Sequence, residues 1–310
     1  LKEAEKSTKI DLQIITAGSS ILAKYGSIDK ILKKDGLKKN LKLHTIIEGN
    51  EPICMVKTTS QTLNELSTAF QRIKPDVVVV IGDRYENLAV AIAASYMNIP
   101  VAHIQGGETT GSIDEKVRHA ITKMSDIHFV STKRAKNFVK NMGEVGSAVF
   151  LTGCPSIDLA KIKDYSLPQN FFNNTGSGAN FYTNENYILV VQHPVTTEFN
   201  DANKQIDQTI EAIKNFHAKT KYKVIWLWPN IDAGSDTFSK KIRMFKETNP
   251  DYVRFIKNFT PESYIKVMKK SKCVVGNSSS GIREASFLGV PTVNIGTRQS
   301  DRERGPNVID

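Results

Sequence analysis

Short runs of apolar, mostly β-branched residues alternate with longer amphipathic segments along the whole chain. Successive positions within these short runs are apolar, so neither face of the corresponding strand would be polar. Strands of a parallel sheet covered by helices on both faces have this pattern. The alternation therefore predicts an α/β protein of the doubly wound type. The expected strands are residues 11–16, 43–47, 76–81, 100–104, 127–130, 148–151, 187–191, 224–227, 253–256, 273–275 and 292–295.

The alternation is interrupted once, at residues 167–185. This stretch is rich in Asn and Gly and follows neither the helical nor the strand period, which is typical of an exposed connection between domains. We therefore expect a first Rossmann-like domain at residues 1–166, a linker at 167–185 and a second Rossmann-like domain at 186–310. A chain of 310 residues is long enough for two such domains.

The charge balance is basic, with 42 Lys and Arg against 32 Asp and Glu. No basic stretch alternates with aromatic residues as single-strand binders require, so we expect no nucleic-acid partner. A positive surface also favours an anionic small molecule. No apolar run approaches the roughly 20 residues that span a bilayer, and the charged first residues lack a signal-peptide core. We therefore expect a cytoplasmic protein with no membrane partner.

Metal, disulfide and common nucleotide motifs are not indicated. The three cysteines lie far apart without CxxC spacing, and the six histidines show no HxxxH or HxH spacing. We therefore expect no metal. The chain contains neither GxGxxG nor a Walker loop, which disfavours a kinase, an ATPase and an NAD-dependent dehydrogenase.

Glycine and polar residues follow several expected strands at their carboxyl ends, where open parallel sheets bind ligands. This placement predicts a cleft between the two domains. One such segment, Gly276-Asn277-Ser278-Ser279-Ser280-Gly281, joins a strand to a helix. One serine is enough to cap a helix, whereas small residues and the free N–H groups of a helix terminus also favour a phosphate. We favour phosphate binding, and capping stays open.

Three further positions have both a structural and a functional interpretation. Asp83 with Glu86 fits a capping box, which the local pattern alone favours. Asp114 and Arg118 share one helix face, so they would form an i,i+4 ion pair or act on a ligand. His193 follows a strand end, where its ring is either structural or directed into the cleft.

In this order, the motifs closely resemble those of the UDP-N-acetylglucosamine 2-epimerase family, and within it the hydrolysing branch that makes N-acetylmannosamine for sialic acid synthesis. The resemblance extends over nearly the whole chain. The motifs that carry it are Gly82-Asp83-Arg84 and residues 103–115, 118–123, 153–156, 192–197, 276–279 and 296–299.

The resemblance implies the glycosyltransferase-B fold, in which two Rossmann-like domains face a cleft. It implies that UDP is eliminated from UDP-N-acetylglucosamine with loss of the C2 proton, and that water adds to the resulting 2-acetamidoglucal. It also implies no metal or nicotinamide cofactor, and a homodimer or homotetramer. The same reaction on UDP-2,4-diacetamido-2,4,6-trideoxyglucose, a UDP-sugar-binding protein with weakened catalysis, and a glycosyltransferase are the alternatives.

Site residues follow from the resemblance position by position. Asp83 and Asp114 match catalytic carboxylates, and His193 matches a histidine that contacts the diphosphate. Gln105 stands where many relatives have a glutamate, and an amide cannot transfer a proton as a carboxylate does. Either Gln105 only orients the substrate and Glu108 or another carboxylate acts, or the activity is reduced. The expected substrate and UDP contacts are Arg84 and Arg118 on the sugar side, Ser278, Ser279 and Gly281 at the phosphate, Glu284 at the ribose, and Arg298 at UDP.

Overall fold

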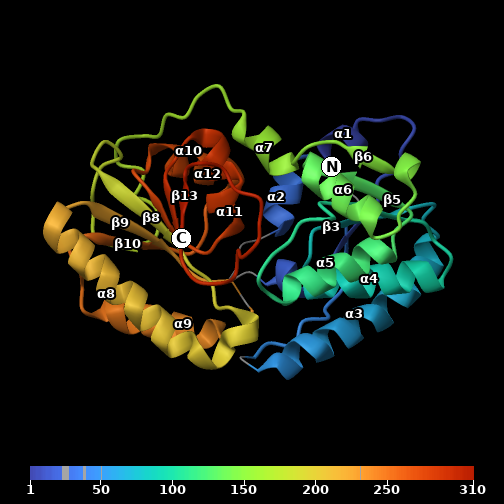
Figure 1. The fold of residues 1–310 in the computed structure, drawn as a ribbon, viewed down its shortest axis with the longest axis horizontal. Helices are drawn as coiled ribbons and strands as arrows, with labels where there is room; N and C mark the ends of the chain where they lie inside the picture. The colour runs from blue at the N-terminus through green and yellow to red at the C-terminus, as the bar shows by residue number, and fades with distance from the viewer. Residues whose placement is uncertain (23–27, 38–39, 50, 231) are drawn as a thin grey trace.

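Two groups of parallel strands, each flanked by helices, lie side by side in the molecule (Figure 1). The computed structural model describes residues 1–22, 28–37, 40–49, 51–230 and 232–310. The sequence prediction of an α/β protein with two Rossmann-like halves is confirmed. No helix in the described residues is long and apolar enough to span a membrane.

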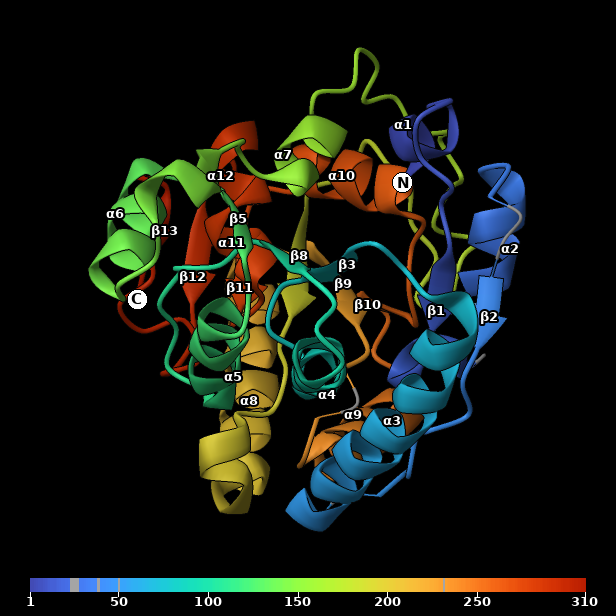
Figure 2. The ribbon, with the colours of Figure 1, turned by 90° about the vertical axis from the view of Figure 1, so that its right-hand side faces the viewer.

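The N-terminal half is built on parallel strands with helices between them. Its elements are α1 (Lys2–Glu5), β1 (Ile14–Thr16), η1 (Gly18–Ile21), α2 (Ile28–Lys34), β2 (Asn40–Lys42), α3 (Pro52–Ile73), β3 (Val78–Ile81), α4 (Tyr85–Tyr96), β4 (Val101–Ile104), α5 (Ile113–Lys123), β5 (Ile127–Val130), α6 (Lys133–Asn141), η3 (Gly146–Ala148) and β6 (Val149–Leu151). Strands β3 to β6 form one sheet in sequence order, and β1 pairs with β2. Figure 2, which faces this half, shows α4 end-on beside α3.

The C-terminal half is a larger sheet in the order β13-β12-β11-β8-β9-β10-β7. Its elements, with the helix that precedes it, are α7 (Pro155–Ala160), β7 (Ser177–Gly178), β8 (Tyr187–Val191), η4 (Thr196–Asp201), α8 (Ala202–Thr220), β9 (Lys223–Leu227), α9 (Ser235–Glu247), β10 (Val253–Ile256), α10 (Pro261–Lys270), β11 (Val274–Gly276), α11 (Ser279–Ile282), α12 (Glu284–Leu288), β12 (Thr292–Asn294) and β13 (Val308–Ile309).

Strand β8 shows why the sequence pattern is apolar on both faces. Tyr187 and Leu189 pack in a core cluster with α10 and α12, while Ile188 and Val190 pack on the opposite face with α8 and α9. In β3, by contrast, only alternate residues are buried, and Val79 is 54% exposed. Burial on both faces is therefore confirmed for the central strand of the C-terminal half and wrong for β3.

The strand predicted at residues 43–47 is wrong, because the observed strand is β2, just before it. The segment packs on α3, where Thr62 Oγ1 donates to Thr45 Oγ1 at 2.8 Å. The backbone N–H of Ile47 donates to Thr58 Oγ1 at 2.9 Å. The side chain of Thr58 therefore accepts a backbone hydrogen bond that a neighbouring strand would otherwise accept. The other predicted strands overlap observed ones, whereas β7 and β13 were not predicted from the sequence.

The linker predicted at residues 167–185 is exposed at many positions, but part of it packs into the C-terminal half. Phe172 and Phe181 are 0% and 2% exposed and belong to the core of the C-terminal half. Strand β7, within this stretch, pairs antiparallel with β10, and Arg254 of β10 donates to the carbonyl oxygen of Gly178 at 2.9 Å. Two aromatic side chains and one buried arginine therefore fix a segment whose composition is otherwise polar.

The division at residues 166 and 186 stays a prediction. Ala160 of α7 is fully buried in the core of the C-terminal half, so the chain contacts that half before residue 166. The two halves also meet along a seam near Gly111, whose N–H donates to the carbonyl oxygen of Arg298 at 3.1 Å. A Cβ atom at Gly111 would lie only 1.8 Å from the carbonyl oxygen of Thr297.

Gly276 at the end of β11 lies very close to the backbone of the neighbouring strand β8. Its φ is +138°, and a Cβ there would lie 2.1 Å from the carbonyl oxygen of Val191 on the neighbouring strand. We expect Gly276→Ala to lower the free energy of unfolding by more than about 3 kcal/mol, because backbone strain and a backbone clash combine. Urea unfolding measures the change.

The matched control is Gly289→Ala, because Gly289 also has a positive φ of +70° but no atom within 4 Å of its would-be Cβ. We expect this variant to lose only about 1 kcal/mol, the cost of the backbone conformation alone. Equal urea midpoints for the two variants would contradict the packing argument.

Candidate active site

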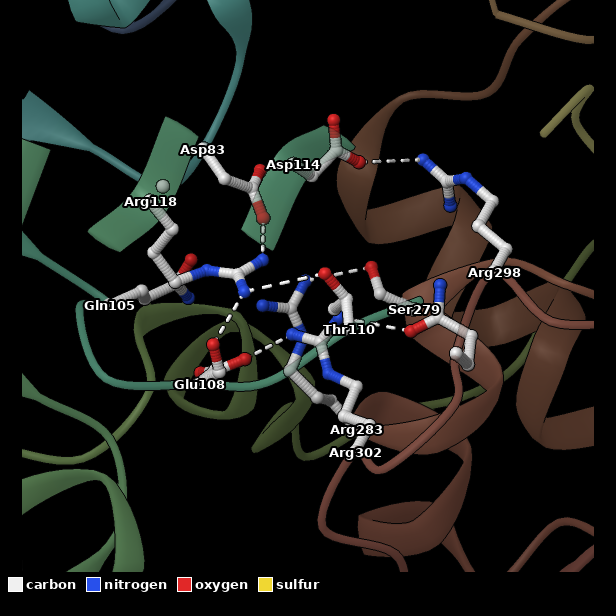
Figure 3. Close-up of a pocket in the computed structure, with 12 residues that line it drawn as sticks. Asp83, Gln105, Glu108, Thr110, Asp114, Arg118, Ser279, Arg283, Arg298 and Arg302 are labelled. Atoms are coloured by element: carbon white, nitrogen blue, oxygen red, sulfur yellow. Dashed lines mark hydrogen bonds and ion pairs between the residues drawn. The ribbon is translucent and has the colours of Figure 1, made fainter. Parts of the chain in front are cut away.

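A pocket lies where the carboxyl ends of β3 and β4 face the loops after β11 and β12 (Figure 3). We call it the arginine pocket, because four arginines line it together with three carboxylates. Such an arrangement favours a ligand that carries several negative charges. Its lining residues are Gly82, Asp83, Gln105, Glu108, Thr110, Asp114 and Arg118 from the N-terminal half, and Ser279, Arg283, Arg298, Gln299 and Arg302 from the C-terminal half.

Arg118 of α5 lies beneath the pocket and is only 1% exposed. Its guanidinium forms an ion pair with the carboxylate of Asp83 and donates to the carbonyl oxygen of Glu108 at 2.6 Å. Burial, followed by the charge of Arg302, lowers the pKa of Arg118 to about 9. The capping-box interpretation of Asp83 is wrong, because Arg84 precedes α4 and no side chain caps that helix.

Asp114 lies in the first turn of α5, after the N-cap Ser112. Its carboxylate is 3.5 Å from Nη2 of Arg298, which reaches across from the C-terminal half. Burial raises the pKa of Asp114, and Arg298 only partly offsets this effect. Of the two interpretations that the sequence left open, the i,i+4 ion pair with Arg118 does not form, because that guanidinium turns instead toward Asp83. Asp114 is therefore a carboxyl group suited to give up and take back a proton.

His103 of β4 contacts both segments that carry the Asp83–Arg118 ion pair, the turn at Gly82 and the helix α5. It is fully buried, and its Nε2 lies 2.9 Å from the carbonyl oxygen of Gly82, which can only accept a hydrogen bond. Burial lowers the pKa of His103 to about 4, so the ring is neutral and carries its hydrogen on Nε2. Its Nδ1 lies 3.1 Å from Thr122 Oγ1, one turn beyond Arg118 on α5, and this hydroxyl also donates to the carbonyl oxygen of Arg118 at 3.0 Å.

Arg84 and His193 do not line the arginine pocket but belong to a neighbouring network. Arg84 forms an ion pair with Asp232 across the cleft, and Asp232 also lies 4.0 Å from Arg298. Burial alone would raise the pKa of Asp232, but Arg84 and Arg298 hold it below its ordinary value. Nδ1 of His193 accepts from the backbone N–H of Asn230 at 3.1 Å. Burial, then Arg298, lowers the pKa of His193 to about 3, so this ring is neutral.

The serines of the loop after β11 have separate roles. Ser278 caps α11 by accepting from the N–H of Ser280 at 3.3 Å, and the buried Ser280 hydroxyl contacts Tyr264 at 2.6 Å. Ser279 alone lines the pocket, where Nη2 of Arg283 donates to its Oγ at 3.1 Å. The capping and ligand-facing interpretations therefore apply to different residues of one loop.

Gly281 and Glu284 lie outside the arginine pocket lining. A Cβ at Gly281 would come within 2.8 Å of Thr292 Cγ2, so this glycine allows α11 to pack on β12. Glu284 is 8% exposed, and its Oε2 is buried without a hydrogen-bond partner in the described residues. Its ribose role stays a prediction.

Sequence reasoning missed Asp232, Arg283 and Arg302 as site residues. Arg302 forms an ion pair with Glu108, which the sequence left open as a catalytic carboxylate. Asp232 could have been found, because it follows the carboxyl end of β9 as the other polar residues follow their strands. In the described residues, no group of three His, Cys, Asp or Glu side chains is arranged to hold a metal ion.

Comparison with known proteins decides the family. The sequence model of a family described as UDP-N-acetylglucosamine 2-epimerase matches residues 2–309. The chain belongs to this family. A UDP-N,N'-diacetylbacillosamine 2-epimerase (hydrolyzing) from Legionella pneumophila is 36% identical over 310 residues, covering 100% of this chain and 80% of the relative. The polysialic acid biosynthesis protein P7 of Escherichia coli is 35% identical, covering 98% of this chain and 76% of the relative.

Solved structures of the family share the fold. A UDP-GlcNAc 2-epimerase from Neisseria meningitidis bound to UDP-GlcNAc has a TM-score of 0.76 at 20% identity, covering 96% of this chain and 78% of that one. The enzyme from Methanocaldococcus jannaschii, in complex with UDP-GlcNAc and UDP, has a TM-score of 0.77 at 21% identity, covering 96% and 80%. The two Rossmann-like halves of the glycosyltransferase-B type are thereby confirmed.

The hydrogen bonds of His103 predict that it positions Asp83. Glutamine can place an amide N–H near the position of Nε2, whereas asparagine reaches only the position of Nδ1. We expect His103→Gln to keep kcat within about fivefold, and His103→Asn to lower it about 10²-fold by displacing the Gly82 turn. Steady-state kinetics with a UDP-sugar, and calorimetry with UDP, measure the two effects separately.

UDP affinity is the internal control for these two variants, because the hydrogen-bond partners of His103, Gly82 and Thr122, both belong to the N-terminal half. We expect the Kd for UDP to stay within about twofold in both. An equal loss of kcat in both variants would mean that His103 only fills space.

Proposed function

We propose that this protein is a hydrolysing 2-epimerase of a UDP-2-acetamido sugar. One observation carries the proposal: Asp114, with a raised pKa, and the ion-paired carboxylate of Asp83 face the same pocket as four arginines. Elimination of UDP needs a proton acceptor and a proton donor near the sugar, together with positive groups at the departing diphosphate. The cytoplasmic location and the homo-oligomer stay predictions.

The C-terminal side of the pocket suits the diphosphate. Arg283, Arg298 and Arg302 offer planar groups with several N–H donors, which match phosphate oxygens in pairs. Ser279 adds a hydroxyl next to Arg283. Negative charge that develops on the leaving UDP is therefore stabilised by fixed positive groups, which need little rearrangement.

The N-terminal side of the pocket suits the sugar. In the proposed first step Asp83 accepts the C2 proton, the C1–O bond breaks, and UDP leaves with the bonding electron pair. In the second step the oxygen of a water molecule bonds to C1 and a proton from Asp114 reaches C2 from the opposite face, which gives the manno configuration. The proton that the water loses restores Asp114, and Asp83 releases the former C2 proton to solvent. Asp114 meets the requirement for this acid because burial keeps part of it protonated at higher pH than an ordinary aspartate.

Gln105 orients the substrate in this proposal. Its Nε2 donates to Cys154 Sγ at 3.2 Å, and its backbone φ is +69°. Glu108 is engaged by Arg302, so the proton-transfer role that the sequence left open falls to Asp114. The relatives from Legionella pneumophila and Campylobacter jejuni, 36% and 32% identical, are diacetylbacillosamine 2-epimerases by name. A 2,4-diacetamido sugar is therefore the second candidate substrate beside UDP-N-acetylglucosamine.

Incubation with each UDP-sugar, followed by NMR of the sugar, tests the proposal. We expect free UDP and a manno-configured 2-acetamido sugar from at least one of the two. UDP binding without turnover, with activity restored by Gln105→Glu, would instead indicate a UDP-sugar-binding protein with weakened catalysis. Transfer of the sugar to an acceptor would indicate a glycosyltransferase.

Asp114→Asn keeps the shape of the side chain but removes its proton. We expect turnover to fall about 10²-fold or more, while the Kd for UDP changes little. In the wild type, kcat should fall as the pH rises through the raised pKa of Asp114, because the protonated form is the one that acts. A pH–rate profile of both proteins measures this loss, and we expect that limb to disappear in the variant.

Glu284→Ala provides the contrast, because the resemblance assigns Glu284 to the ribose. We expect it to weaken UDP binding and to leave the pH–rate profile unchanged.

Normal turnover by Asp114→Asn would show that Asp114 serves only in its ion pair with Arg298.

A further inference from the structure

One nitrogen of Arg298 lies between two carboxylates. Its Nη2 is 3.5 Å from the carboxylate of Asp114, as Figure 3 shows, and 4.0 Å from that of Asp232. Both distances exceed the roughly 2.7–2.9 Å of a charge-assisted hydrogen bond. The other terminal nitrogen, Nη1, donates to the carbonyl oxygen of Asn277 at 3.2 Å and holds the guanidinium on the C-terminal half. Arg298 is therefore shared between two carboxylates and fully paired with neither.

Asp232 is a buried negative charge in a fixed position. It is 3% exposed and lies between β9 and α9. Its Oδ1 accepts from Nη1 of Arg84 at 2.5 Å, and its Oδ2 accepts from Nδ2 of Asn230. Its backbone carbonyl oxygen accepts from the N–H of Ser235 at 2.9 Å. Because both carboxylate oxygens are engaged, Asp232 stays in place and attracts Arg298 across 4.0 Å.

The charged groups around Asp114 act on it in opposite directions. Burial raises the pKa of Asp114, and Arg298 lowers it. Asp232 raises this pKa again, whereas Arg84 and the hydrogen bond with the N-cap Ser112 lower it. The proton affinity of Asp114 therefore depends on how closely Arg298 approaches it and on the charge of Asp232.

The remaining titratable groups nearby leave this balance unchanged. His193 lies beside the same arginines but is neutral, because burial lowers its pKa to about 3. The other charged side chains that line the arginine pocket pair away from Asp114. These pairs are Asp83 with Arg118, Glu108 with Arg302, and Arg283 with Glu284.

We propose that Asp232 is a positioning residue for proton transfer by Asp114. Its fixed charge holds Arg298 between the two carboxylates and so keeps that arginine from forming a full ion pair with Asp114. Asp232 does not line the arginine pocket, so it acts through Arg298. Arg84 in turn holds Asp232 from the N-terminal half. This inference rests on the proposed 2-epimerase function and names a residue that controls its acid.

Two substitutions break the Arg84–Asp232 ion pair from opposite ends and should have opposite effects. In Asp232→Asn the side chain keeps its shape but loses its charge, so Arg298 pairs with Asp114 and lowers its pKa. In Arg84→Gln, Asp232 draws Arg298 more strongly, and Asp114 loses the charge of Arg84 as well, so its pKa rises.

The pH dependence of kcat/KM reports the groups of the free enzyme and measures both effects. We expect the limb at which kcat/KM falls with rising pH to move down by about one pH unit or more in Asp232→Asn. Above that limb, kcat/KM should therefore be about tenfold lower than in the wild type. In Arg84→Gln the limb should move up by about half a pH unit or more.

A titration that needs no turnover gives the same comparison. The carboxyl carbon of Asp114 can be followed by NMR in protein labelled with ¹³C-aspartate, and its signal is identified by its loss in Asp114→Asn. Lys241→Gln is the matched control, because it breaks a 2.8 Å ion pair with Asp207 between α8 and α9, away from the site. It should leave the Asp114 titration and the pH profile at their wild-type values.

The outcomes separate the inference from the function on which it rests. If the wild type converts neither UDP-sugar, the proposed function fails, and the NMR titration still tests the role of Asp232. If Asp114 titrates at one pH in the wild type and both variants, or shifts in the same direction in both, the inference fails. A uniform loss of turnover would then mean that the Arg84–Asp232 pair only holds the two halves together.

Discussion

The buried charge of Arg118 is the constraint on which the site depends. A guanidinium that is 1% exposed is tolerable only when charged and polar groups surround it. Asp83 supplies the opposite charge, and the carbonyl oxygen of Glu108 accepts from the same group. His103 then holds both the turn before Asp83 and the helix that carries Arg118. Compensation of one buried charge thus fixes the positions of the residues that we propose to face the sugar.

Contact between the two halves sets the electrostatics of the proposed acid. Arg298 comes from the C-terminal half, and it lies near both Asp114 and Asp232. Arg84 comes from the N-terminal half and forms an ion pair with Asp232. Asp232 therefore has two arginine neighbours, and Arg298 is shared between Asp232 and Asp114. A phosphate that drew Arg298 away would leave Asp114 with less positive charge nearby and favour its protonated form. In the proposed reaction, substrate binding and the protonation of Asp114 are therefore coupled through Arg298.

Local sequence predicts most strands of this fold, because a buried parallel strand is recognisable from its own residues. It fails at residues 43–47, where Thr58 of α3 accepts a backbone hydrogen bond, and within residues 167–185, where two buried phenylalanines and Arg254 fix an otherwise polar stretch on the C-terminal half. Prediction of the ion pairs from local sequence also fails, because their partners are set by tertiary contacts. The i,i+4 rule pairs Asp114 with Arg118, whereas the fold brings their partners from residues far along the chain.

The net charge of +10 says less about function than the kind and place of the cations. Lysines outnumber arginines in the chain, but among the residues that the structure describes the cations lining the arginine pocket are all arginines. A lysine at position 118 would carry the charge on a single compact group, whereas the guanidinium reaches Asp83 and Glu108 with different nitrogens. The same property lets Arg302 contact Glu108 and Gln299 at once. The anion recognition that we propose therefore depends on planar, multidentate cations that other protein groups already hold in place.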